Sequence, residues 1–296
     1  MTERTNWGEF LISATIRIIG FSTIGFVVLI FFFLVQQGAP ALTLVPPGEF
    51  FGTRWYPTFD LYGMMPLFLG SLLVTFTAIV IALPLGVSTA VYVREIAPPW
   101  AREFLKPMIE VLAGIPSVVL GFFGMTVLAP VLRETFNLPT GLTAFTGALI
   151  LAYMALPTMV SVAEDALDAI PKSYRDAALA MGATHWQTIW RVIVPAARSG
   201  ILTAVMLGIG RAIGETMVVL MVTGNAARMP ITPGSLFLPV RTMTATIAAE
   251  MGEVAAGSTH YHVLFFIGII LFVLTFLINL AAAPAVLAKR RRGGLR

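Results

Sequence analysis

Arg211 and Glu215 are the two ionisable residues within an otherwise apolar stretch, residues 199–223. Residues four apart share one face of a helix, which would bring the two side chains together. If this stretch crosses a membrane, each charge costs about 2.5–3.5 kcal/mol at its centre, so both must face a bundle interior or a wet cavity. A guanidinium offers a planar pair of donors to a tetrahedral oxyanion. The alternative is an internal ion pair that only holds helices together.

Other reactive chemistry has little support in the sequence. The chain has no cysteine, which removes disulfides and thiolate ligands. None of its lysines, Lys106, Lys172 and Lys289, lies in a G-x4-G-K-[ST] phosphate-binding loop, so ATP hydrolysis must belong to another chain. His260 and His262 have no acidic residues beside them at metal-ligand spacing and are interpreted as interfacial polar residues. We expect no enzymatic activity, no cofactor and no metal.

The composition indicates an integral membrane protein. Hydrophobic residues make up 57% of the 296 residues and charged residues 11%, whereas soluble domains carry about 25% charged residues. The net charge of +4 does not imply a nucleic-acid partner, because the basic residues lie in loops and one tail. Orientation in a lipid bilayer explains that distribution better.

Six apolar stretches are long enough to cross a bilayer as helices, which takes about 20 residues each. The predicted fold class is therefore an all-α polytopic membrane protein with six transmembrane helices. Residues 18–35 form the first span, retained as an anchor because no cleavage site follows it. The organisation comprises an N-terminus (1–17), an outer loop (36–66), a core (67–288) with a second outer loop (224–262), and a basic tail (289–296). Spans within the core are expected at 67–93, 110–131, 141–163, 199–223 and 263–288.

The basic residues predict that both ends of the chain face the cytoplasm. In that orientation 14 of the 19 lysines and arginines lie on the cytoplasmic side and four lie outside. The four outer arginines are Arg54, Arg133, Arg228 and Arg241. Arg211 is the remaining one, inside a span.

Residues 173–195 are the one substantial helical segment too polar for a membrane. Ser173 with Asp176, and Thr184 with Gln187, have capping-box spacing and predict two helix starts. Gly182 lies between them, where a left-handed residue would end the first helix. The second helix is expected to end before Pro195. The sequence thus predicts two short helices joined by a tight corner on the cytoplasmic side.

The spacing in this segment, D-A-A-x3-G-x9-V-x-V-P, resembles the "EAA" loop of ABC-importer permeases. Asp176 stands where that family usually has Glu, while Ala177, Ala178, Gly182 and Pro195 match. The resemblance implies that these residues form a coupling helix that fits into a groove on a separate ATPase subunit. A connector between two membrane helices with no partner is the alternative.

Most of the chain resembles the permease subunits of the phosphate-specific importers, in particular the PstC-type subunit. It rests on the segments FGTRWYP (51–57), AGIPSVVLGFFG (113–124), GRAIGETMVVLMVTGN (210–225) and TATIAAEMGE (244–253). The resemblance implies a type I ABC-importer permease architecture in the prokaryotic inner membrane and inorganic phosphate as substrate. The implied partners are a PstA-type permease, a PstB-type ATPase dimer and a PstS-type extracytoplasmic phosphate-binding protein.

Rival interpretations remain open at this point. The RAxGE core alone is also typical of permeases for sulfate, molybdate or tungstate. A secondary transporter or channel would need its own ion-coupling acids in mid-span, and Glu215 is the only such residue. A membrane-bound enzyme would need a nucleophile with a base, and no such constellation is evident.

Overall fold

The computed structural model describes residues 7–293, and it describes side chains for residues 11–232 and 234–280. The ends of the predicted N-terminus and basic tail, residues 1–6 and 294–296, lie outside the described residues. The described chain is mostly helical. Its main helices are α1 (Trp7–Gly38), α3 (Met65–Val91), α4 (Pro99–Ala113), α5 (Ser117–Phe123), α6 (Ala129–Thr135), α7 (Ala144–Asp168), α8 (Lys172–Ala180), α11 (Arg198–Gly214), α12 (Met217–Val222), α13 (Met243–Glu250) and α14 (Thr259–Gly293).

Shorter elements connect these helices. They are α2 (Ala41–Leu44), α9 (His185–Thr188), α10 (Val194–Ala196), 3₁₀ turns at Glu49–Phe51, Pro57–Phe59 and Pro233–Phe237, and wide i→i+5 turns at Tyr92–Ile96, Gly124–Leu128 and Ile189–Ile193. The strands β1 (Trp55–Tyr56) and β2 (Leu61–Tyr62) pair antiparallel, with Trp55 opposite Tyr62.

Five described helices are long and apolar enough to cross a membrane. A sixth span results only if the bent pair His185–Ala196 and Arg198–Gly214, which meet at 69°, counts as one. The predicted third span, 110–131, is wrong in its boundaries. The chain breaks between α4 and α5, and the apolar span is Ser117–Thr135. Pro116 is extended (φ −60°, ψ 137°) and occupies the N-terminal capping position of α5, so the chain leaves the helical conformation between α4 and α5.

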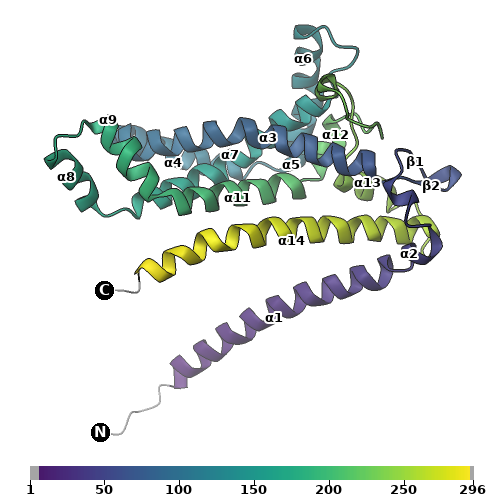
Figure 1. Cartoon of the computed structure of the whole chain (residues 1–296), viewed down its shortest axis with the longest axis horizontal. Coiled ribbons are helices and arrows are strands. Elements are labelled where there is room, and N and C mark those ends of the chain that lie inside the picture. Colours follow the sequence, from purple (N-terminus) through teal and green to yellow (C-terminus); the bar gives the residue numbers. More distant parts are fainter. Residues whose placement is uncertain (1–6, 294–296) are drawn as a thin grey trace.

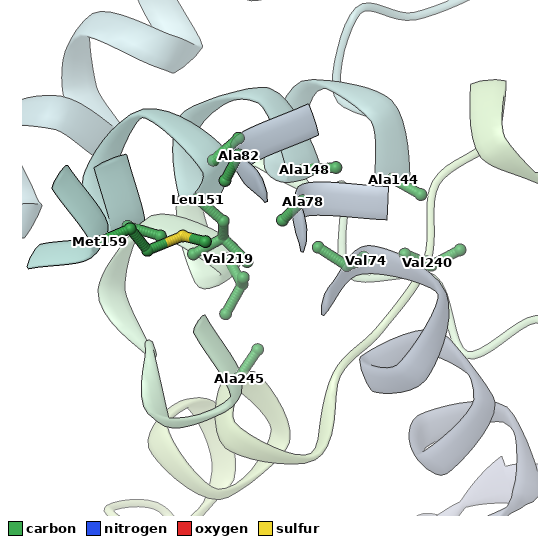
Figure 2. Close-up of a cluster of buried hydrophobic side chains, with 12 residues drawn as sticks. Val74, Ala78, Ala82, Ala144, Ala148, Leu151, Met159, Val219, Val240 and Ala245 are labelled. Atoms are coloured by element: carbon green, nitrogen blue, oxygen red, sulfur yellow. The ribbon is translucent and has the colours of Figure 1, made fainter. Parts of the chain in front are cut away.

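The centre of the molecule is a layer formed by α3, α7 and α11, with α7 packed against both neighbours (Figure 1). Small and medium side chains of α3 and α7, joined by Val219 of α12 and Ala245 of α13, fill the core between these helices (Figure 2). The helices approach so closely that some contact positions have room only for glycine. A Cβ on Gly208 of α11 would lie 2.6 Å from Cγ of Met159 on α7. Such small residues let membrane helices pack backbone to backbone.

Helices α1 and α14 lie beside one another outside this layer (Figure 1). Phe31 packs on Phe272 and Phe33 on Phe265, with ring centroids 4.9 and 5.7 Å apart. Otherwise α1 presents apolar side chains outward along most of its described length, as a lipid-facing helix does. Both α1 at its start and α14 at its end point towards the end of the molecule that carries α8 and α9 (Figure 1).

The two loops predicted to face outward lie at the opposite end (Figure 1). The first is ordered and buries Phe50 and Trp55 against α14 and neighbouring segments. The second contains α13, whose last residue is Glu250. Its carboxylate is half-buried, forms an ion pair with Arg241 at 2.7 Å and is hydrogen-bonded to Nε2 of His260 at 2.9 Å, while Glu253 is exposed.

Candidate substrate path and coupling surface

The apolar segment that carries Arg211 and Glu215 is interrupted between the two residues. Helix α11 ends at Gly214, Glu215 is extended (φ −71°, ψ 133°), and α12 begins at Met217. The prediction that Arg211 and Glu215 share a helix face is therefore wrong. A helix break leaves backbone groups without partners. Oγ1 of Thr244 on α13 donates to the carbonyl of Glu215 at 2.9 Å and satisfies one of them.

The Glu215 side chain turns back onto the break. Its Oε1 accepts a hydrogen bond from the backbone N–H of Thr216 at 3.1 Å. A break inside a membrane segment is tolerated only where it is buried in protein or lines a wet cavity. Glu215 therefore acts locally on the backbone of the break, and the described side chains include no ion pair between it and Arg211.

Arg211 is half-buried on the last turn of α11. Its Nη1 donates to Oγ1 of Thr158 on α7 at 3.1 Å. Among the described residues no carboxylate lies within ion-pair distance of this guanidinium. A hydroxyl fixes the guanidinium without neutralising it, so the positive charge remains available to an anion.

The start of α13 fixes this break to α3. The N–H of Met243 donates to Oγ of Ser71 at 2.9 Å. Gly70 lies so close to the carbonyl of Arg241 that a Cβ would collide with it. Thr242 caps α13 by accepting from the N–H of Ala245. The break is thus held by a rigid helix start rather than by a loose loop.

The corner predicted at 173–195 is present, with one of its two capping boxes. In the second box, the N–H of Gln187 donates to Oγ1 of Thr184 at 3.2 Å, and the N–H of Thr184 donates to Oε1 of Gln187 at 3.0 Å. Gly182 is left-handed, with φ +82°. The capping box expected of Ser173 and Asp176 does not form. The capping position is two residues earlier, at Pro171, which has no side-chain acceptor, and helix α8 begins at Lys172.

The expectation that the second helix ends before Pro195 is also wrong. The chain stays helical through α10, which includes Pro195, and bends at Ala197 before α11. A wide i→i+5 turn, Ile189–Ile193, comes directly before Pro195. A local i→i+5 turn of this kind re-satisfies the backbone groups that a proline frees within a continuing helix.

The surface around this corner is exposed and partly apolar. None of the residues of α8 is buried, and Asp176 and Ala177 face solvent with Ala178 half-buried. Met181 has 88% of its surface exposed, and Trp186 packs edge-on against Trp190 with centroids 5.6 Å apart. Exposed apolar groups gathered in one place are typical of a protein-binding surface.

Ion pairs tie this corner to the membrane helices. Arg175 of α8 binds both carboxylate oxygens of Glu95, with Nε to Oε2 at 3.1 Å, and donates to the carbonyl of Ile170. The hydrogen bond with Glu95 raises the pKa of Arg175 above its ordinary value. Nearby, Arg94 pairs with Asp168, and Nζ of Lys106 pairs with Oε2 of Glu164 at 3.0 Å. The first pair attaches the corner to the turn after α3, and the other two hold that turn and α4 against the end of α7.

Residues 82–292 match the family described as "Binding-protein-dependent transport system inner membrane component". The chain belongs to this family. It is 43% identical over 79% of its length to a probable ABC transporter permease protein, YqgH, of Bacillus subtilis, covering 75% of that protein. It is 38% identical to a phosphate transport system permease protein, PstC, of Mesorhizobium japonicum, over 76% of this chain and 73% of that one.

Solved structures agree with this fold. The inward-facing MetNI methionine ABC transporter matches with a TM-score of 0.60 at 20% identity, over 79% of this chain and 99% of that one. A bacterial alginate ABC transporter matches with a TM-score of 0.60 at 15% identity, and the match covers 94% of this chain and 95% of that one. The chain is therefore a multi-pass inner-membrane permease subunit and not an enzyme, and family membership implies an ATPase and a binding protein as partners.

Sequence reasoning missed the groups that hold the candidate residues in place. Thr158 and Thr244 contact the Arg211–Glu215 region from α7 and α13, far away in sequence. Glu95 is 80 residues from Arg175. Unlike the repeated spacing of a helix, a contact between distant helices leaves no local pattern, so no signal in a single sequence could have identified these partners.

Proposed function

We propose that this chain is the phosphate-translocating permease subunit of an ATP-driven importer. The observation that carries the proposal is the Arg211 guanidinium, half-buried beside a break in a membrane segment and bonded to the hydroxyl of Thr158. A planar, permanently charged donor pair suits a tetrahedral oxyanion. The relatives named phosphate transport system permease protein PstC support phosphate as that oxyanion.

In this proposal Glu215 belongs to the substrate path in a supporting role. Its side chain accepts from the backbone at the break, and its negative charge lowers the net positive charge near Arg211. Conduction needs binding weak enough for release. A carboxylate in the same segment of the chain, without an ion pair to the guanidinium among the described residues, serves that need.

The coupling residues in the proposal are Asp176, Ala177, Ala178, Gly182 and Pro195. They lie on or beside the exposed corner whose ion pair, Arg175 with Glu95, reaches α3. Closure of two PstB-type ATPase subunits would move α8 and change the packing of α3, α7 and α11, exposing the Arg211 region to each side in turn. A PstA-type permease would complete the pathway, and a PstS-type protein would deliver phosphate.

The proposed orientation places α8, α9 and both chain ends in the cytoplasm. The distribution of basic residues supports it. So does the position of α8 at the same end as the start of α1 and the end of α14 (Figure 1). The loops 36–66 and 224–262 would then face the binding protein.

Uptake of labelled phosphate by the reconstituted complex tests the proposed function. We expect ATP-dependent uptake in the presence of the binding protein, with little competition from sulfate or molybdate. Uptake of sulfate or molybdate in preference to phosphate would identify that oxyanion, and not phosphate, as the substrate. Uptake without ATP would instead support a secondary transporter or channel.

A further inference from the structure

Three of the four arginines assigned to the outer side line one pocket. Arg54, Arg228 and Arg241 surround a cavity of about 650 Å³ between the β1 strand region and the segment that follows α12. These residues come from separate parts of the sequence, so the fold gathers them. The fourth outer arginine, Arg133, lies outside this pocket.

The pocket carries positive charge that its acidic neighbours do not balance. Among the described side chains, Arg54 and Arg228 form no ion pair, and Arg241 pairs with Glu250. Glu250 is in turn shared with His260, and the indole N–H of Trp55, in the pocket wall, donates to it. Two guanidinium charges therefore remain without a carboxylate partner among the described residues.

The wall also keeps unused hydrogen-bonding capacity. Nε of Arg241 and Oδ1 of Asn225 are buried without a partner in the described part of the chain. Asn225 is left-handed, with φ 49°, and its amide nitrogen donates to the carbonyl of Leu220 at 2.6 Å. Nε of Arg241 can donate to an anion, whereas Oδ1 of Asn225 only accepts and so suits a bound water or a protonated phosphate oxygen.

The pocket wall is joined to the break near Arg211 by a short stretch of backbone. Arg241 lies three residues before Thr244, whose hydroxyl holds the carbonyl of Glu215. The backbone between them is fixed on α3 through Ser71. A volume of about 650 Å³ is many times the roughly 30 Å³ that one water occupies in the liquid. The pocket thus has room for an oxyanion with its hydration shell.

We propose that this three-arginine pocket is a second oxyanion site, which holds hydrated inorganic phosphate before it reaches Arg211. The inference rests on the proposed function for the identity of the anion, and on the pocket itself for the site. Weak binding at more than one position is what conduction requires. The site also raises the local concentration of an anion at the pathway entrance, as clefts lined by one sign of charge do.

Thiol protection in the assembled complex tests the site. The chain has no cysteine, so Thr58→Cys at the pocket rim gives one reactive thiol on this chain. We expect inorganic phosphate to slow its reaction with a negatively charged methanethiosulfonate, compared with chloride at equal ionic strength. A cysteine at the exposed position Ala256, outside the pocket, should show no such protection.

Arginine substitutions then locate the bound anion. Arg54→Gln with Arg228→Gln should raise the phosphate concentration for half-protection about tenfold, as loss of roughly 1.4 kcal/mol from charge-assisted hydrogen bonds predicts. The matched substitution Arg133→Gln should leave it unchanged. Absence of protection in the parent protein, or equal protection in all variants, would overturn the site.

Two further outcomes separate the alternatives. If the arginine variants lose affinity for the binding protein while phosphate protection persists, the pocket is a docking surface and the inference is wrong. If sulfate protects through the same arginines while the complex imports no phosphate, the pocket stands as an oxyanion site and the proposed function fails.

Discussion

Arg175 on α8 and Glu95 in the wide turn that follows α3 form a two-pronged ion pair between the exposed corner and the end of a membrane segment. The Glu95 side chain keeps 5% of its surface exposed and that of Arg175 21%. A buried guanidinium–carboxylate pair fixes orientation as well as distance. Any displacement of α8 by a partner is therefore transmitted to α3, which packs along α7.

Breaking this pair should separate coupling from assembly. Glu95→Gln should cost about 1–3 kcal/mol of stability, because the guanidinium stays buried with a weaker partner. It should also reduce the phosphate imported per ATP hydrolysed. A double-mutant cycle with Arg175→Met should give a coupling energy of about 0.5–3 kcal/mol. Additive effects of the two changes would contradict the pair, and Lys172→Met, exposed on the same helix, serves as the control.

Arg211→Lys should assemble and hydrolyse ATP but import phosphate at least about tenfold more slowly, because lysine keeps the charge and loses the planar fork. Glu215→Gln should be milder, since the amide oxygen still accepts from Thr216. Uptake per assembled complex measures both. Near-normal uptake by the double variant Arg211→Gln/Glu215→Gln would remove these residues from the substrate path.

Gly182 allows a matched comparison of two isosteric residues. Asparagine and aspartate both tolerate the left-handed conformation found there, and a Cβ would meet no atom within 4 Å. Gly182→Asn should therefore keep the corner and retain the ATPase. Gly182→Asp adds a charge at the proposed interface and should weaken co-purification of the ATPase about tenfold or more. Equal behaviour of the two variants would argue against an interface at this corner.

Glu250 should make the outer cluster sensitive to acid. Burial alone raises its pKa, but the hydrogen bond with His260, the charge of Arg241 and the bond from Trp55 outweigh this and hold the pKa below its usual 4.5. A lowered pKa means that the stabilisation is complete above pH 4.5 and is lost as the pH falls through the lowered value. Melting temperature between pH 6 and 3 should drop less in Glu250→Gln than in the parent protein. Parallel profiles would exclude this role for Glu250.

Single cysteines test the proposed orientation. In intact cells, Ala256→Cys should react with an impermeant maleimide, whereas Ser173→Cys should react only after the membrane is opened. Both positions are exposed, so accessibility within the protein is not limiting. The reverse pattern would place α8 outside and exclude an intracellular ATPase as its partner.

Local patterns in the sequence predicted the elements that depend on local physics. Apolar length indicated the membrane helices, and five of them meet that test in the structure. Gly182 and the Thr184–Gln187 capping box were predicted because a positive φ and an exposed N–H demand particular residues. The boundaries failed at prolines, because the chain stays helical through Pro195 in α10 but leaves the helical conformation at Pro116 before α5.

The sequence by itself determined the class of protein, its membrane character and the segment that forms the exposed corner, because composition and short-range spacing carry that information. The tertiary structure decided how the charges are used. It separated Arg211 from Glu215 by ending α11 at Gly214, and it placed Thr158 and Thr244 against them. It also gathered Arg54, Arg228 and Arg241 around one pocket. These relationships join residues on different elements, and the free energy of packing those elements together, rather than any local preference, fixes them.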